Sequence, residues 1–100
     1  MAGHVVRVMR GTAKPGKGTK FRDYLEEKVI PRCQAYPGVI SVAIGAPRPD
    51  KPDEFTVITI WKNLAALTEF VGPDWQRVYR FPDDEEHLEM STVEHYFARA

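Results

Sequence analysis

Several aromatic side chains in this sequence could form a binding site for a planar ligand. Trp61 ends an apolar segment, and its indole could stack on an aromatic ring while its N–H donates a hydrogen bond. Trp75 and Tyr79 are four residues apart, the spacing that places two side chains on the same side of a helix. Phe55 and Phe70 are further apolar candidates for the wall of such a site.

The polar candidates are a tyrosine, a histidine, an asparagine and an arginine. The Tyr79 hydroxyl and the His95 imidazole could transfer protons, and the Asn63 amide could orient a substrate oxygen. Arg7, if it is buried, could bind an enolate or a carboxylate. Each candidate also has a structural interpretation: packing for the aromatic residues, helix capping for Asn63, and pairing with a carboxylate such as Glu94 for the arginine.

Metal, nucleophile and phosphate-binding motifs are not evident. His4, His87 and His95 lie far apart, and no pair has a metal-ligand spacing such as H-x-x-x-H. Cys33 continues the apolar stripe of a predicted helix, so we expect a buried thiol that behaves as a small hydrophobic group. No glycine-rich phosphate loop follows a strand. We therefore expect neither a metal nor another cofactor.

Four segments have the pattern of β-strands: residues 4–12, 39–47, 54–62 and 91–98. The third segment shows the clearest alternation of side chains between two faces. One face carries Phe55, Val57, Thr59 and Trp61, and the other carries Thr56, Ile58 and Ile60. A proline-rich turn between the second and third segments indicates a hairpin with a long loop.

A helix is predicted from Thr19 to about Tyr36, because apolar residues recur at helical spacing. These residues are Phe21, Leu25, Val29 and Cys33. The Thr19 hydroxyl could cap the start of this helix, and Pro31 should kink it or end its first part near Ile30.

A second helix should follow Asn63, which is a good N-cap residue. A third, short helix is predicted after Pro73, with Trp75, Val78 and Tyr79 on one face. The acidic run at residues 83–86 is best interpreted as a solvated loop or a helix start. The order β-α-β-β-α-β predicts an α+β fold: a ferredoxin-like four-stranded antiparallel sheet with helices on one face.

Both faces of the central strands are apolar, which indicates that both need to be covered. In the first strand, Val6 and Val8 oppose Val5 and Met9. The helices of one chain can cover only one face, and 100 residues form one domain without a second sheet. A two-fold homodimer is the simplest way to cover the other face, although a monomer with a partly exposed apolar face is the alternative.

The overall charge excludes two classes of partner. Lys plus Arg and Asp plus Glu number 14 each, so no electrostatic footprint for nucleic acid or for an anionic membrane is expected. No apolar run approaches the length of a membrane span, and no signal peptide is visible. A single cysteine suits a reducing compartment, so a cytoplasmic location is expected.

Several short motifs follow one another in an order that resembles a known family. They are Lys14-Pro15-Gly16-Lys17 after the first strand, Tyr36-Pro37-Gly38-Val39, Asp53-Glu54-Phe55, Ile60-Trp61-Lys62-Asn63, and Gly72-Pro73-Asp74-Trp75-Gln76-Arg77. Over residues 4–98 the chain resembles the antibiotic biosynthesis monooxygenase family of dimeric α+β barrels. This family includes cofactor-free oxygenases that act on aromatic polyketides and quinols, and also haem-degrading oxygenases.

The resemblance implies a substrate pocket between the sheet and the helices, without a bound flavin or metal centre. It therefore implies a cofactor-independent monooxygenase for a small phenol or quinol, with aromatic pocket walls and with Tyr79, His95, Asn63 or Arg7 in the polar roles. A non-catalytic dimer that binds a small hydrophobic ligand is the alternative.

The haem-degrading branch fits the sequence less well. That branch uses an asparagine, a tryptophan and a haem-ligating histidine. The corresponding positions fall near Met9, near Glu69 or Phe70, and near Tyr79. None of them matches, although a tyrosine can also ligate haem iron.

Overall fold

Four antiparallel strands form one sheet in the order β2-β3-β1-β4. The computed structural model describes residues 3–45, 47–77 and 87–98. The strands are β1 (Val5–Ala13), β2 (Val39–Gly45), β3 (Glu54–Trp61) and β4 (Leu88–Phe97). All four predicted strands are present, and the largest difference is that β4 begins at Leu88 rather than at residue 91.

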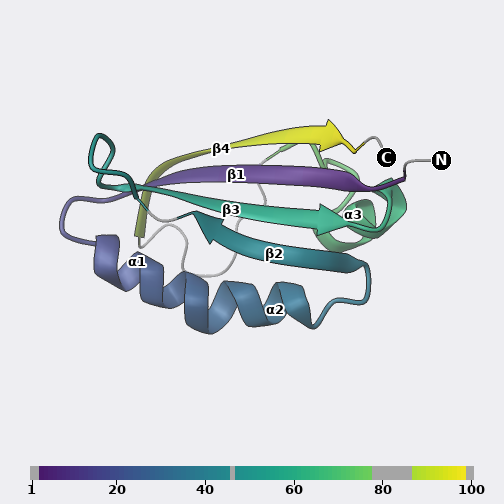
Figure 1. Ribbon diagram of the computed structural model, residues 1–100, viewed down its shortest axis with the longest axis horizontal. Coiled ribbons are helices and arrows are strands. Elements are labelled where there is room, and N and C mark those ends of the chain that lie inside the picture. The colour runs from purple at the N-terminus through teal and green to yellow at the C-terminus, as the bar shows by residue number, and fades with distance from the viewer. Residues whose placement is uncertain (1–2, 46, 78–86, 99–100) are drawn as a thin grey trace.

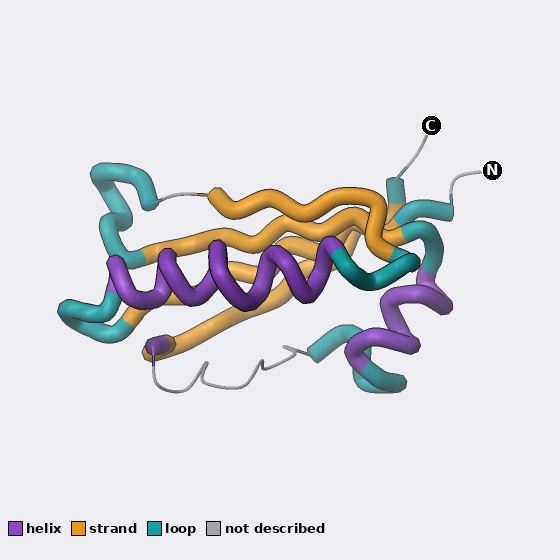
Figure 2. Tube along the Cα trace, turned by 90° about the horizontal axis from the view of Figure 1, so that it is seen from below, coloured by secondary structure: helices purple, strands orange, loops and turns teal. Residues whose placement is uncertain are grey.

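The helices lie on one face of this sheet. In Figures 1 and 2 the first helical segment runs along that face, and the helix after β3 lies near one end of the sheet. The predicted ferredoxin-like α+β architecture is therefore confirmed. None of the helices in the described part of the chain has the length and apolar character needed to cross a membrane.

The first helical segment continues through its proline instead of ending there. It consists of α1 (Gly18–Tyr24), a π-helical turn η1 (Leu25–Val29) and α2 (Ile30–Gln34). Pro31 has no N–H to donate, and its ring would clash with a carbonyl of the preceding α-helical turn. The wider π turn directly before α2 accommodates this proline. The helix starts at Gly18 without a side-chain cap, so the predicted capping role of Thr19 is wrong.

The second predicted helix is α3 (Leu64–Val71), and its cap is the expected one. The Ala66 N–H donates to Asn63 Oδ1 at 2.8 Å. Gly72, with φ of 97°, ends the helix in a conformation that favours glycine. The following residues 73–77 form turns, so the predicted third helix is not formed there. Its remaining predicted members, Val78 and Tyr79, lie outside the described residues.

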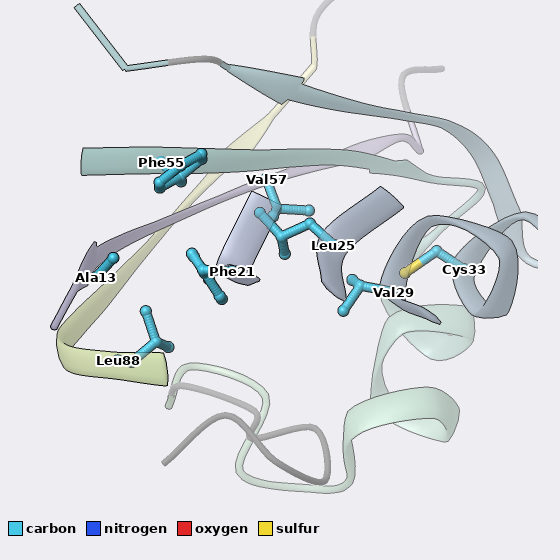
Figure 3. Close-up of a cluster of buried hydrophobic side chains, with 8 residues drawn as sticks. All are labelled: Ala13, Phe21, Leu25, Val29, Cys33, Phe55, Val57 and Leu88. Carbon is cyan, nitrogen blue, oxygen red and sulfur yellow. The ribbon is translucent and has the colours of Figure 1, made fainter. Parts of the chain in front are cut away.

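A hydrophobic core fills the space between the first helical segment and the sheet. Its buried side chains are Ala13, Phe21, Leu25, Val29, Cys33, Phe55, Val57 and Leu88 (Figure 3). The helical residues are those of the predicted four-residue stripe, and Phe55 and Val57 belong to the predicted strand face that also carries Thr59 and Trp61. A second buried cluster of Val5, Trp61 and Leu67 lies beneath α3.

The register of the sheet places a polar row within this apolar face. Arg7 pairs with Thr59 of β3 and with His95 of β4, so the three side chains point toward the helices. Arg7 and Thr59 are buried, with 6% and 4% of their surfaces exposed. On this face, the polar row lies between two apolar pairs of β1 and β3, Val5 with Trp61 and Met9 with Val57.

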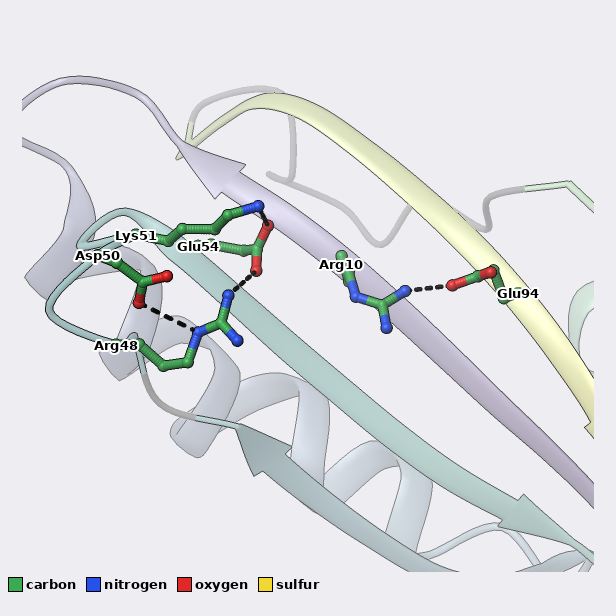
Figure 4. Close-up of polar contacts among 6 residues, drawn as sticks. All are labelled: Arg10, Arg48, Asp50, Lys51, Glu54 and Glu94. Carbon is green, nitrogen blue, oxygen red and sulfur yellow. Dashed lines mark hydrogen bonds and ion pairs between the residues drawn. The ribbon is translucent and has the colours of Figure 1, made fainter.

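The opposite face of the sheet has no helix over it. Val6, Val8, Ile58 and Ile60 on this face are only partly buried, and Tyr96 is 52% exposed. Charged side chains on this face and in the loop between β2 and β3 form ion pairs (Figure 4). Examples are Arg10 with Glu94, Arg48 with Asp50 and Glu54, and Lys51 with Glu54.

Gly38 allows α3 to pack closely against the start of β2. A Cβ atom at this position would lie 2.5 Å from the Cβ of Ala66 in α3. We expect Gly38→Ala to destabilise the protein by about 1–3 kcal/mol, because α3 must shift to relieve this contact. Urea unfolding would measure the change.

The matched control for this prediction is Ala66→Gly, which removes the other carbon of the contact. It should cost about 1 kcal/mol in the wild-type background through lower helix propensity. Combined with Gly38→Ala, it should recover part of the lost stability. A Gly38→Ala protein with the unfolding midpoint of the wild type would contradict this account of the packing.

Candidate functional site

A small cavity lies between the sheet and the helices. Its volume is about 40 Å³. It is lined by Arg7, Met9, Leu25, Val29, Cys33, Val57, Thr59, Trp61, Phe70 and Val71. Most of this lining is apolar, and the exceptions are the guanidinium of Arg7, the hydroxyl of Thr59 and the thiol of Cys33. Figure 3 shows four of these side chains: Leu25, Val29 and Cys33 of the helical segment, and Val57 of β3.

Arg7 is the charged group in the wall of this cavity. Its Nη1 donates to the backbone carbonyl of Trp75 at 2.8 Å and lies 2.8 Å from His95 Nε2. Its Nη2 donates to the carbonyl of Arg77 at 3.1 Å. Arg7 therefore links the sheet to the turn that follows α3.

No carboxylate of the described residues forms an ion pair with Arg7, whereas Arg10 and Arg48 pair with Glu94 and Asp50. Burial lowers the pKa of Arg7 to about 10, which still leaves the side chain positively charged at neutral pH. The cavity therefore contains a buried cation that is held by neutral acceptors. Such a group favours the ionised form of an acidic ligand placed beside it.

His95 accepts a hydrogen bond from Arg7 rather than acting on the cavity directly. A guanidinium can only donate, so Nε2 must accept, and the ring is neutral with its proton on Nδ1. Burial, and then the nearby charge of Arg7, lower the pKa of His95. The ring also contacts the edge of Trp75, with 4.9 Å between ring centroids. His95 thus helps to position Arg7.

The lowered pKa of His95 predicts a pH dependence of stability. The unfolded chain binds a proton near the ordinary pKa of 6.5, whereas the folded protein binds it only at lower pH. The contribution of His95 to stability is therefore complete above pH 6.5 and is lost as the pH falls through the folded-state pKa. Urea midpoints at about pH 7.5 and 5.5 should differ more for the wild type than for His95→Gln. An equal pH dependence of the two proteins would contradict this assignment.

Trp61 and Phe70 form the aromatic wall of the cavity, and Tyr36 packs against both rings. The ring centroid of Trp61 lies 5.2 Å from that of Phe70 and 5.9 Å from that of Tyr36. Only 1% of Trp61 is exposed, and its Nε1–H donates to Thr59 Oγ1 at 2.9 Å. The indole N–H is therefore already paired within the fold, and Trp61 can offer a ligand its ring.

The structure brings some of the predicted site residues together and separates others. Arg7, Trp61 and Phe70 line the cavity, and Trp75 and His95 adjoin it through their contacts with Arg7.

Two predicted site residues lie elsewhere in the fold, and one is not described. Phe55 packs in the core and borders a different cleft, beside Gly16 and Pro52. Asn63 caps α3 at the surface. Tyr79 lies outside the described residues. The proposed roles of all these residues remain predictions.

Seven of the ten residues that line the cavity were not among the predicted site residues: Met9, Leu25, Val29, Cys33, Val57, Thr59 and Val71. Met9 and Thr59 belong to the inner faces of their strands, and Cys33 belongs to the predicted helical stripe. Periodicity indicated only that they are buried. Val71 is the last residue of α3. Burial raises the pKa of Cys33, and the nearby Arg32 and Arg7 partly oppose this, so its thiol is protonated at neutral pH.

The described residues contain no group of three or more histidine, cysteine or acidic side chains arranged to hold a metal ion.

The sequence profile of the antibiotic biosynthesis monooxygenase family matches residues 4–80. This chain belongs to that family. A search of curated proteins found no match.

Solved structures share the fold across nearly the whole chain. A protein from Shewanella oneidensis is 23% identical, covers 98% of this chain and 93% of its own, and has a TM-score of 0.80. A protein from Pseudomonas aeruginosa is 21% identical, with coverages of 100% and 98% and a TM-score of 0.77. SnoaB, a cofactor-independent oxygenase from Streptomyces nogalater, is 19% identical, with coverages of 99% and 96% and a TM-score of 0.76.

Proposed function

We propose that this protein is a cofactor-independent monooxygenase that oxidises a small phenol or enolisable aromatic ketone between its sheet and helices. The observation that carries the proposal is an apolar, aromatic-walled cavity that contains the buried cation Arg7. Membership of the antibiotic biosynthesis monooxygenase family supports the class of reaction. The fold shared with the cofactor-independent oxygenase SnoaB supports it further.

The proposed reaction needs only the substrate and O₂. An anthrone loses a proton to solvent to give its enolate, which transfers an electron to O₂. The resulting radical pair combines to a peroxide anion, which takes up a proton from solvent to form a hydroperoxide. Loss of water from the hydroperoxide gives the quinone, so one oxygen atom ends in the new carbonyl group and the other in water. Arg7 would stabilise the enolate, because an opposite charge nearby favours the ionised form of an acid.

The cavity must enlarge before it can hold an aromatic substrate. Its volume is about 40 Å³, whereas a dry cavity that binds benzene has a volume of about 150 Å³. The walls formed by β1 and β3 are fixed by sheet hydrogen bonds. Phe70 and Val71, in the last turn of α3 before Gly72, are the wall residues that can move with the least disruption. Substrate binding should therefore displace the end of α3.

Oxygen uptake with anthrone as the substrate tests the proposal. An oxygen electrode should record uptake above the rate of spontaneous oxidation, with one molecule of O₂ consumed for each molecule of quinone formed. The reaction should proceed in the presence of a metal chelator and without added flavin. Uptake equal to that of a protein-free control, over a panel of anthrones and naphthols, would contradict the proposal.

Two other outcomes would point to the alternative functions. Tight binding of these compounds without turnover would favour a non-catalytic ligand-binding protein. A stoichiometric Soret shift on addition of haem would favour the haem-degrading branch of the family.

The active form in this proposal is a homodimer that joins the two open sheet faces. The partly buried aliphatic side chains of β1 and β3 on this face, together with Ile40 at 51% exposure, form the surface to be covered. Burial of this surface contributes about 25 cal/mol per Å² before the cost of association. Light scattering should give twice the chain mass of 11.4 kDa, and Ile58→Lys should lower this value. A stable particle of 11.4 kDa at micromolar concentration would contradict the dimer.

A further inference from the structure

The hydrogen bonds of Arg7 leave one edge of its guanidinium group unused. A guanidinium has five N–H donors. Both hydrogens of Nη1 are engaged, by the carbonyl of Trp75 and by His95 Nε2, and one hydrogen of Nη2 is engaged by the carbonyl of Arg77. Within the described residues, the Nε–H and the second Nη2–H have no hydrogen-bond partner.

The two remaining donors are matched to a ligand with two oxygen atoms. The carbonyls of Trp75 and Arg77 come from one turn. They accept hydrogen bonds from Nη1 and Nη2, at the end of the guanidinium where these two nitrogens lie side by side. The edge that remains is formed by Nε and Nη2. Two parallel N–H groups on such an edge fit the two oxygens of a carboxylate.

Among the described residues, no carboxylate compensates the charge of Arg7. Only 6% of the surface of Arg7 is exposed. Its hydrogen-bond partners in the described chain are two backbone carbonyls and a neutral imidazole. Burying a charge is costly unless the charge is paired. Arg7 lines the cavity, so an anion bound in the cavity could supply the missing charge.

We propose that Arg7 binds the anionic end of an aromatic ligand through two adjacent oxygen atoms. The ligand class is an aromatic carboxylate, or a phenolate whose neighbouring carbonyl supplies the second oxygen. The inference deepens the proposed function and rests on it for the location of the substrate. The rest of the cavity contacts the apolar ring system, and Arg7 selects for the charge.

Binding of two ligands of the same shape tests this selection. Titration of the wild-type protein with 2-naphthoate and with 2-naphthamide, followed by tryptophan fluorescence and calorimetry, compares a carboxylate with a neutral amide. We expect 2-naphthoate to bind at least about tenfold more tightly, as expected for a charge-assisted, bidentate contact. Equal affinities, or no binding of 2-naphthoate, would overturn the inference whether or not any variant folds.

Variants of Arg7 and Arg10 test which arginine causes the preference for 2-naphthoate. Arg7→Met should abolish the preference for 2-naphthoate, and Arg7→Lys should reduce it because an ammonium group retains the charge but lacks the paired donors. Arg10→Met is the matched control, since Arg10 lies on the same strand, on the opposite face, and pairs with Glu94. A preference that disappears in Arg10→Met but persists in Arg7→Met would place the anion on the open sheet face and overturn the inference.

The ligand-binding test and the oxygen-uptake test can fail independently of each other. A protein that prefers 2-naphthoate but consumes no oxygen with anthrones would support the anion site and contradict the proposed reaction. A protein that oxidises anthrones but does not distinguish 2-naphthoate from 2-naphthamide would support the reaction and contradict the anion site.

Discussion

Replacing Arg7 with methionine is expected to lower kcat/KM for anthrone oxidation by about 100-fold or more. The enolate is the species that gives an electron to O₂, and Arg7 is the buried positive charge in the cavity wall. Removal of a single preorganised donor to a developing oxyanion costs roughly 10²–10³ in rate. Methionine keeps an unbranched apolar stem, so the comparison isolates the guanidinium. Steady-state oxygen uptake would measure the effect.

Arg10→Met provides the control for this loss of activity. Arg10 occupies the same strand but faces away from the helices, and its partner Glu94 is exposed. An exposed ion pair of this kind contributes about 0–1 kcal/mol, so Arg10→Met should keep nearly the full rate. Circular dichroism should show that both variants are folded. If folded Arg7→Met oxidised anthrone at the wild-type rate, Arg7 would have no role in stabilising the enolate.

Phe21→Ala is expected to lower the free energy of unfolding by about 3–5 kcal/mol. Phe21 is fully buried, and its ring meets that of Phe55 edge to face, with 5.3 Å between centroids. Truncation removes both this contact and the burial of the ring, and it leaves a cavity between α1 and the sheet (Figure 3). A domain with a total stability of about 5–15 kcal/mol would lose a large fraction of it.

Phe97→Ala removes the same atoms from an exposed position and serves as the control. Phe97 is 61% exposed at the end of β4, so this change should cost no more than about 1 kcal/mol. Both variants should be unfolded in urea at the same protein concentration as the wild type, because a dimer would couple stability to concentration. Equal losses for the two variants would show that Phe21 does not belong to the principal core.

The sheet could be predicted because its inner face has a simple pattern. Phe55, Val57, Thr59 and Trp61 alternate with less buried residues along β3, and this alternation is the period of a strand. The helical stripe of the first helix was equally regular. At Pro31 the sequence predicted a kink or an end of the first helical part near Ile30, but not the π turn that precedes α2. After Pro73, residues 73–77 form turns, and the rest of the predicted third helix lies outside the described residues.

The partners of Arg7 depend on strand register, which composition does not reveal. The pairing of β1 with β4 places His95 opposite Arg7 and Glu94 opposite Val8. A shift of one residue would bring the carboxylate of Glu94 to Arg7 and neutralise it. The sequence suggested a carboxylate partner for a buried arginine, whereas the register places the neutral ring of His95 opposite Arg7. The backbone carbonyls that hold Arg7 depend on the conformation of a turn, which side-chain patterns do not specify.

The most direct test of the central claim is a crystal structure of the protein with bound 2-naphthoate. The account predicts that the naphthyl rings lie between Trp61 and a displaced Phe70, and that the carboxylate accepts hydrogen bonds from Nε and Nη2 of Arg7. A ligand on the open sheet face, or one whose carboxylate points to solvent away from Arg7, would contradict the assignment of this cavity as the substrate site.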